Sequence, residues 1–155
     1  MTKVLFVCLG NICRSPMAEG LMRQYSEEHQ LGLIVDSAAT SRWEVGNPVY
    51  PGTKQILQRE NIDSSHMFSR QIKPEDFEMF DWIIGMDHEN VEDLLAMAPK
   101  QARHKVHLYL EVVPGKENQK VPDPWYTGNF DQTYHLLQAG LPLWAEKFKM
   151  ETKTD

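Results

Sequence analysis

The segment from Cys8 to Pro16 reads CLGNICRSP and places an arginine, Arg14, six residues after a cysteine. In a tight loop that leads into a helix, residues 9–14 can turn successive backbone N–H groups toward one centre, where a tetrahedral oxyanion fits. Arg14 can add a bidentate guanidinium group. A thiolate at a helix start or beside an arginine is stabilised, so Cys8 is expected to be a nucleophile, with Ser15 able to bond its sulfur. The pattern predicts attack by sulfur on a bound phosphoryl group.

A leaving oxygen also needs a proton, and Asp123 is a candidate acid from a distant part of the chain. It lies in the segment VPDPWY at Val121–Tyr126. The two prolines stiffen its backbone, and Trp125 and Tyr126 can limit its contact with water and grip an aryl group. Taken alone, Asp123 could be an ordinary turn residue before a proline. Together with the cysteine loop, it would complete a site for phosphoryl transfer.

The elements that must position these residues alternate between strand and helix. Lys3–Val7 is β-branched and aromatic with no polar break after its first residue, which predicts a central strand buried on both faces. Ser15 is predicted as the N-cap and Pro16 as the first residue of a helix that reaches Tyr25. The further predicted elements are a strand at Leu33–Val35, a helix at Pro51–Asn61, a strand at Trp82–Ile84, a helix capped by Asp87, a strand at Val106–Leu110 and a helix from Asn129 onward.

This alternation predicts an α/β fold, a three-layer sandwich in which a four-stranded parallel sheet of the Rossmann or flavodoxin type is flanked by helices. Ligands of such sheets bind at the carboxyl ends of the strands, where Cys8 and Arg14 fall. In the last helix, Pro142 interrupts an apolar stripe, so a kink or break is expected near Gly140–Pro142. Pro114–Pro124 is the longest predicted loop.

Length and composition favour one globular domain over all 155 residues, with a flexible tail at 150–155. The 16 Lys and Arg residues against 22 Asp and Glu residues give a formal charge of −6, which disfavours general binding to nucleic acid or anionic membranes. The longest apolar run, Val4–Leu9, is too short to span a bilayer, so a cytoplasmic protein is expected. Only two cysteines occur, and His104 and His107 lack partners in ligand spacing, so neither a metal nor a cofactor is expected.

The cysteine loop, the Asp123–Pro124 pair and Met86–Asp87 after a predicted strand together resemble the low-molecular-weight protein tyrosine phosphatase family, whose size and element order also match essentially the whole chain. The resemblance implies metal-independent hydrolysis of phosphotyrosine in proteins and of small aryl phosphates. It implies that Cys8 is the nucleophile, that Arg14 binds the phosphoryl group and stabilises the transition state, and that Asp123 is general acid and then base. The implied phosphate-binding residues are Leu9, Gly10, Asn11, Ile12, Cys13, Arg14 and Ser15.

The same resemblance assigns supporting residues. Cys13 matches the second cysteine of the family, which can form a reversible disulfide with the nucleophile, although a packed loop thiol is the alternative. His66 could also be a solvated loop histidine, and Trp43 could serve loop packing. The implied aryl slot is formed by Ile12, Trp43, Trp125 and Tyr126. The implied supports of the loop are Asn11, Ser15, His66 and Asp87.

Related and unrelated activities compete with this interpretation. Protein arginine phosphatases of the family carry threonine where this chain has Ile12, so the apolar residue favours phosphotyrosine. Arsenate reductases with the same loop need further cysteines, and none follows Cys13. A phosphate-binding module without turnover stays open, as does a thiol–disulfide oxidoreductase, which the four residues between Cys8 and Cys13 disfavour. The expected partners are tyrosine-phosphorylated proteins, and the expected state is a monomer or a weak self-association through the aromatic rim.

Overall fold

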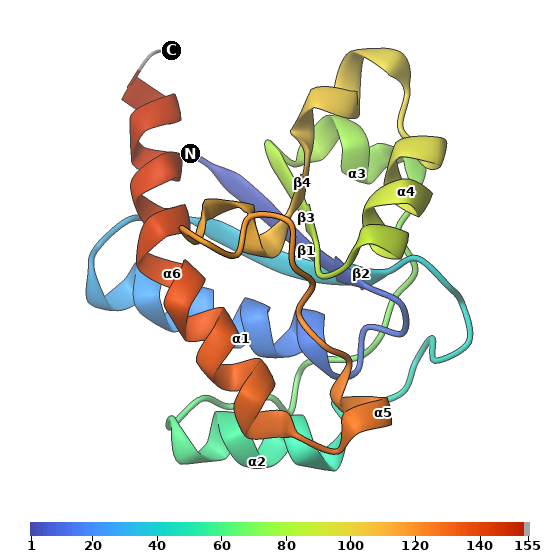
Figure 1. The fold of residues 1–155 in the computed structure, drawn as a ribbon, viewed down its shortest axis with the longest axis vertical. Helices are drawn as coiled ribbons and strands as arrows, with labels where there is room; N and C mark the ends of the chain where they lie inside the picture. Colours follow the sequence, from blue (N-terminus) through green and yellow to red (C-terminus); the bar gives the residue numbers. More distant parts are fainter. Residues whose placement is uncertain (154–155) are drawn as a thin grey trace.

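The computed structural model describes residues 1–153, and the side chains of residues 1–151. Its centre is a four-stranded parallel sheet with the strand order β2-β1-β3-β4 (Figure 1). The predicted α/β fold is therefore confirmed. The strands are β1 (Lys3–Cys8), β2 (Ile34–Ala39), β3 (Trp82–Gly85) and β4 (Val106–Leu108).

Strand β1 lies in the middle of the sheet because its side chains can be buried on both faces. From Val4 to Val7 none of its residues exposes any surface. Its last residue, Cys8, pairs with Ala39 of β2, and Val7 pairs with Gly85 of β3. Because the three strands are parallel, their carboxyl ends meet at one edge of the sheet, and the loops that follow them lie near one another.

Helices cover both faces of the sheet (Figure 1). Helices α1, α2 and α6 share an apolar core with Phe6 and Ile84, whereas α3 and α4 share a second core with Leu5 and Ile83. This alternation is the period of two that a strand imposes on its side chains. The helices are α1 (Arg14–Glu28), α2 (Pro51–Arg59), α3 (Pro74–Met79), α4 (His88–Met97), α5 (Pro124–Thr127) and α6 (Phe130–Lys153), with the 3₁₀ segments η1 (Lys100–Lys105) and η2 (Tyr109–Val112).

The prediction of Ser15 as the helix N-cap is wrong. Helix α1 begins at Arg14, its N-cap residue is Cys13, and no side chain caps it. The Ser15 hydroxyl instead lies 3.0 Å from the Cys8 sulfur. The predicted cap at Asp87 is confirmed, because its carboxylate accepts a hydrogen bond from the backbone N–H of Asn90 in the first turn of α4.

Of the kink or break predicted near Gly140–Pro142, the break is wrong, because α6 continues through Pro142. The kink stays a prediction. Pro142 is exposed, and hydrogen bonds hold the turns before and after it. The Tyr109 hydroxyl donates to the Leu137 carbonyl over 2.6 Å, and the Trp144 indole N–H donates to the Tyr109 carbonyl over 2.8 Å. These tertiary contacts hold α6 on both sides of the backbone bond that a proline removes.

Some element boundaries differ from the prediction. The second strand runs on to Ala39, and the fourth ends at Leu108, where the chain turns into η2. Helix α6 reaches Lys153, so residues 150–153 of the predicted tail are helical. The rest of that tail, residues 154–155, lies outside the described residues.

Candidate active site

Cys8 and Arg14 stand at the two ends of a short loop, because Cys8 ends β1 and Arg14 begins α1. Cys8 is 3% exposed and Arg14 is 2% exposed. The Ser15 hydroxyl faces the Cys8 sulfur, and the backbone N–H of Asn11 donates to that sulfur over 3.3 Å. Two polar groups and the start of a 15-residue helix therefore surround the sulfur, as a nucleophilic thiolate requires.

The Arg14 guanidinium is held by three acceptors from other loops. Its Nη1 donates to the carboxylate of Asp87 over 2.8 Å and to the Val121 carbonyl over 3.0 Å. Its Nη2 lies 3.5 Å from an oxygen of Asp123. Burial acts against the charge of Arg14, but the neighbouring Cys8, Asp87 and Asp123 outweigh it and raise the pKa of the guanidinium. Arg14 is therefore a fixed positive charge within the protein.

Asn11 ties the middle of the loop to the protein around it. Its backbone is left-handed, with a φ of 57°, a region that asparagine tolerates better than most residues. Its side-chain amide donates to the hydroxyls of Ser15 over 2.8 Å and Ser37 over 2.9 Å. Its side-chain oxygen accepts the backbone N–H of Arg70. The asparagine thereby orients Ser15, the residue whose hydroxyl faces the Cys8 sulfur.

A buried acid that the sequence analysis missed continues this network away from the loop. Glu19 accepts a hydrogen bond from the Ser37 hydroxyl over 2.5 Å and from Arg23 over 2.6 Å. Burial raises the pKa of Glu19, while Ser37 and Arg23 act in the opposite direction. The signal in the sequence is an acidic residue on the face of α1 that also carries Pro16 and Arg23, and its i,i+4 pairing with Arg23 can be read from the spacing. Its partner Ser37 comes from β2 and cannot be read from spacing.

The hydrogen-bonding partner of His66 is Arg23 and not a residue of the cysteine loop, so the loop support implied for it stays a prediction. Its ring nitrogen Nε2 lies 3.3 Å from Nη1 of Arg23, and the histidine is exposed. It reaches Asn11 only through Arg23, Glu19 and Ser37.

Asp123 lies where the long loop after η2 meets α5. It is the N-cap of α5, and its carboxylate accepts the backbone N–H of Trp125 over 3.0 Å. The loop is anchored by Val121, whose backbone N–H donates to the Met86 carbonyl over 2.9 Å and whose carbonyl accepts from Arg14. Asp123 therefore stands beside the cysteine loop, as predicted for a distant acid.

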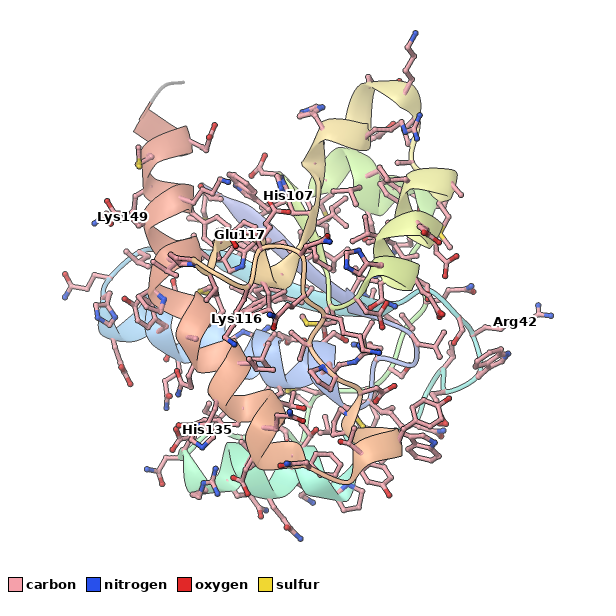
Figure 2. All side chains as sticks on the ribbon, in the orientation of Figure 1. Arg42, His107, Lys116, Glu117, His135 and Lys149 are labelled. Atoms are coloured by element: carbon pink, nitrogen blue, oxygen red, sulfur yellow. The ribbon has the colours of Figure 1, made fainter. Side chains whose placement is uncertain are left out.

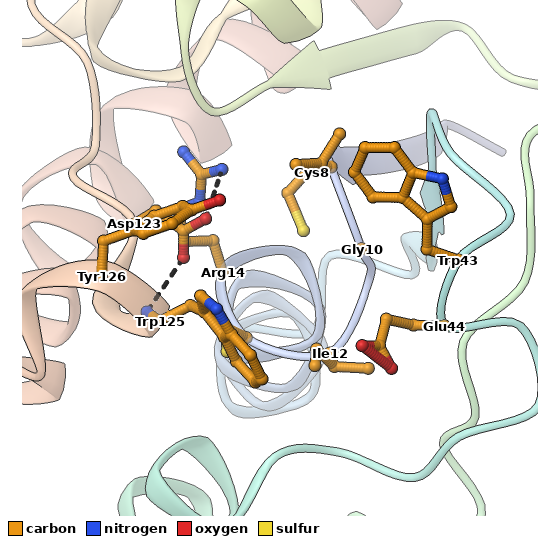
Figure 3. Close-up of a pocket in the computed structure, with 11 residues that line it drawn as sticks. Cys8, Gly10, Ile12, Arg14, Trp43, Glu44, Asp123, Trp125 and Tyr126 are labelled. Carbon is orange, nitrogen blue, oxygen red and sulfur yellow. Dashed lines mark hydrogen bonds and ion pairs between the residues drawn. The ribbon is translucent and has the colours of Figure 1, made fainter.

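A cavity of about 190 Å³ opens above the Cys8 sulfur (Figure 3). Trp43 stands on one side of the opening, and Trp125 and Tyr126 stand on the other. These three aromatic side chains are exposed, and Arg42, next to Trp43, extends into solvent (Figure 2). The cavity is lined by Cys8, Leu9, Gly10, Ile12, Cys13, Arg14, Trp43, Glu44, Asp123, Trp125 and Tyr126, of which Glu44 was not foreseen.

Cys13 is buried at the N-cap of α1 and lines the same cavity as Cys8. Neither cysteine is in a disulfide. Burial raises the pKa of the Cys13 thiol to about 12, and the neighbouring Cys8 and Asp123 act in the same direction. Its backbone carbonyl accepts the hydroxyl of Thr53 over 3.1 Å. The two thiols therefore differ in their surroundings although they share one loop.

Within the part of the chain that the structure describes, no group of three or more His, Cys, Asp or Glu side chains could hold a metal ion. His107 is paired with Glu111 over 2.9 Å, and it is not among the residues that line the cavity. Between residues 1 and 153, no helix has the length and apolar character to cross a membrane.

The fold and the site define a class of protein, a parallel α/β protein with a thiol and a guanidinium at an oxyanion-binding turn. A model of the family described as low molecular weight phosphotyrosine protein phosphatase matches residues 3–154. The low molecular weight protein-tyrosine-phosphatase YfkJ of Bacillus subtilis is 44% identical over 142 residues, which cover 90% of this chain and 91% of that protein. The PtpA protein of the same description from Staphylococcus epidermidis is 42% identical over 140 residues, or 90% of this chain and 88% of that one.

Solved structures agree. The crystal structure of YfkJ has a TM-score of 0.93 at 40% identity and covers 97% of this chain and 96% of that chain. That of the low molecular weight protein tyrosine phosphatase from Streptococcus pyogenes has a TM-score of 0.84 at 44% identity and covers 95% and 93%. The chain belongs to the low molecular weight phosphotyrosine protein phosphatase family and is an enzyme of that class.

Proposed function

We propose that the protein hydrolyses phosphotyrosine in proteins, and small aryl phosphates, through a phosphocysteine at Cys8. The observation that carries the proposal is one cavity that joins the Cys8 sulfur, the Arg14 guanidinium and the Asp123 carboxyl under an aromatic rim. The family relationship supports the reaction class. The geometry supports the role of each residue.

In the first step, the Cys8 thiolate attacks phosphorus as the bond to the tyrosine oxygen breaks. Asp123 in its carboxylic acid form gives its proton to that oxygen, so tyrosine leaves as a neutral phenol. Arg14 and the backbone N–H groups of residues 9–14 bind the three oxygens that carry charge in the transition state. In the second step, the Asp123 carboxylate takes a proton from water, which attacks the phosphocysteine and releases phosphate and thiolate.

The contacts around these groups support this order of events. Asn11 holds the Ser15 hydroxyl against the sulfur, so the thiolate that leaves in the second step is stabilised. Asp87 accepts a hydrogen bond from Nη1 of Arg14, which restricts the direction of the guanidinium. The mechanism uses no metal and no cofactor.

The aryl group of the substrate is proposed to lie between Ile12 and the rings of Trp43, Trp125 and Tyr126. A planar ring between apolar and aromatic walls gains contact area that a smaller alkyl group does not. Ile12 supports phosphotyrosine over phosphoarginine because an apolar wall has no hydrogen bond to offer a guanidinium. The whole chain of 155 residues is proposed to act as one domain.

We also propose that the protein acts in the cytoplasm, on tyrosine-phosphorylated proteins, as a monomer or a weakly associating species. A reducing compartment supports this because a free thiol is needed at Cys8. Oxidation that joins Cys8 to Cys13 in a reversible disulfide is proposed to protect the nucleophile, and the presence of both free thiols at one cavity supports it. The acidic net charge supports the absence of nucleic acid partners.

The test is hydrolysis of para-nitrophenyl phosphate and phenyl phosphate from mildly acidic to neutral pH, with a chelator present. Cys8→Ser should abolish turnover, and Asp123→Asn should lower kcat most for phenyl phosphate, whose leaving group is the poorer one. Asp131→Asn, an exposed aspartate on α6, is the matched control and should behave as wild type.

Other outcomes identify other functions. Phosphate binding without turnover by wild type would show an oxyanion-binding module. Faster hydrolysis of phosphoarginine than of phosphotyrosine would show an arginine phosphatase. Reduction of insulin disulfides at the rate of a thioredoxin would show an oxidoreductase.

A further inference from the structure

Two aromatic rings, Tyr50 and Phe130, continue from Trp125 of the aryl slot as a row of three, and neither of them lines the cavity. The ring of Tyr50 meets the ring of Trp125 edge to face, with 5.1 Å between the ring centroids and 67° between the planes. On its other side, Tyr50 is stacked on Phe130 at 5.7 Å and 7°. The row joins the start of α2, the helix α5 and the start of α6, which lie side by side in Figure 1.

Tyr50 also contacts a second residue that lines the slot, Ile12, through its backbone. Its N–H donates to the carbonyl of Ile12 over 2.9 Å. Ile12 lines the cavity from the cysteine loop, and Trp125 lines it from α5. One residue thus connects two walls that come from parts of the chain more than one hundred residues apart.

The Tyr50 ring is itself held in place from behind. Phe130 lies so close to the backbone of Gly52 that a Cβ atom there would be 2.5 Å from the Phe130 ring. Only a glycine leaves the room that this ring occupies. The backbone of Tyr50 is fixed as well, because its carbonyl accepts the N–H of Lys54 in the first turn of α2.

We propose that Tyr50 is a positioning residue that sets the gap of the aryl slot, and with it the preference for aryl over non-aromatic phosphoryl compounds. The inference rests on the proposed function, because it concerns the same slot. The edge-to-face contact with Tyr50 restricts the Trp125 indole to one orientation. The hydrogen bond from the Tyr50 N–H to the Ile12 carbonyl fixes the position of Tyr50, and so of this indole, relative to the cysteine loop. Tyr50 touches no reacting atom.

The experiment separates the side chain from the backbone of Tyr50. Tyr50→Leu removes the ring and keeps the backbone N–H, whereas Tyr50→Phe keeps the ring. The affinities for benzylphosphonate and for inorganic phosphate are measured by calorimetry, and by competition between the two ligands for the site. Neither measurement depends on turnover. Tyr25→Leu is the matched control, since Tyr25 is a half-buried tyrosine stacked on His29 away from the cavity.

For Tyr50→Leu, benzylphosphonate should bind about three- to tenfold more weakly, the range of one lost aromatic pair, while inorganic phosphate binds as before. Tyr50→Phe and Tyr25→Leu should match wild type for both probes. Equal weakening of both probes in Tyr50→Leu, or no weakening of either, would overturn the proposal. If wild type turns over no aryl phosphate, the proposed function fails, and that result is distinct from an unchanged ratio of the two affinities.

Two further variants guard against a simple loss of folding. In a Trp43→Phe background, Trp125 is the exposed tryptophan, since Trp82 and Trp144 are buried. There, Tyr50→Leu should increase quenching of fluorescence by acrylamide if it frees the indole. Gly52→Ala, which displaces Phe130, should weaken benzylphosphonate in the same direction and leave phosphate binding unchanged. No change in quenching or in the affinity ratio for these variants would contradict the role of the aromatic row.

Discussion

The cysteine loop and the aromatic rim of the cavity are built in opposite ways. The loop is one contiguous segment, its polar side chains are buried, and Asn11, Arg14 and Ser15 each find partners inside the protein. The rim is made of side chains from the loop after β2 and from helix α5, and Trp43 and Tyr126 are 76% and 77% exposed. The proposed chemistry thus rests on fixed hydrogen bonds, whereas the proposed recognition rests on exposed rings whose orientation depends on their neighbours.

Because of this difference, substitutions in the loop and in the rim should have different effects on stability and on rate. A buried polar group that loses its partner keeps the full cost of its desolvation, so changes in the loop should affect both stability and rate. An exposed ring has little to lose in the folded protein, so changes in the rim should affect substrate binding alone. Four predictions test this contrast, in order of decreasing size.

The largest effect is expected for Arg14→Lys. Lysine keeps the charge but loses the planar fork that meets Asp87, Val121 and a phosphoryl group together. We expect kcat/KM for para-nitrophenyl phosphate to fall about 10²–10³-fold, the usual cost of one lost transition-state donor. Arg59→Lys, an exposed arginine paired with Asp131, is the control and should be unchanged. A fall in kcat/KM of less than threefold for Arg14→Lys would show that a point charge is sufficient.

Asn11→Ala should destabilise the protein by about 2–3 kcal/mol, because it removes three hydrogen bonds and places alanine in left-handed backbone. It should also lower kcat, since Ser15 loses its orienting partner. Chemical denaturation measures the first effect and steady-state kinetics the second. Asn118→Ala at an exposed position should change neither quantity. If Asn11→Ala had the stability and the kcat of wild type, the hydrogen bonds of Asn11 would not be what holds the loop in place.

The buried thiol of Cys13 should make the free energy of unfolding depend on pH in the alkaline range. The pKa of its thiol is about 12 in the folded protein against 9.0 as the ordinary value. The unfolded chain therefore loses this proton first, and the stabilisation, fully present below pH 9, declines as the pH rises toward 12. In that interval, wild type should lose about 1.4 kcal/mol of unfolding free energy per pH unit more than Cys13→Ser. Parallel pH profiles of the two proteins would contradict this burial effect.

Trp125→Ala should have the smallest effect and one confined to recognition. We expect KM for aryl phosphates to rise about three- to tenfold, while the free energy of unfolding changes by no more than about 0.5 kcal/mol. Inhibition by inorganic phosphate serves as the internal control and should stay as in wild type. A loss of stability comparable to that of Asn11→Ala would contradict the expectation that substitutions in the rim affect substrate binding alone.

Most of the fold follows from local patterns in the sequence. The apolar strand ending at Cys8, the turn after it and the cap at Asp87 are signals carried by neighbouring residues, and the structure bears them out. The role of Ser15 and the unbroken course of α6 at Pro142 do not follow from local patterns, because a tertiary partner is involved in each case. The sulfur of Cys8 competes for the hydroxyl that could have capped α1, and packing against Tyr109 keeps α6 intact around its proline.

The residues of the candidate site also fall into two groups, those that residue types identify and those that depend on tertiary contacts. The contiguous cysteine loop and the Asp123 segment could be recognised from residue types, and the structure brings them to one cavity. Glu19 and Val121 could not, because their roles depend on pairing with β2 and with the end of β3. Val121 acts through its backbone N–H and carbonyl, which every residue except proline has, so its side chain gives no sign of this role.

The anchoring of Val121 also bears on the timing of catalysis. Its backbone is bound on one side to the end of β3 and on the other to Arg14, and its side chain is fully buried, two residues before Asp123. Enzymes that deliver an acid on a mobile flap have a turnover gated by the rate of closure. Here the proposed acid stands ready before any substrate arrives, so the enzyme needs no such gate, and kcat should be insensitive to the viscosity of the solvent.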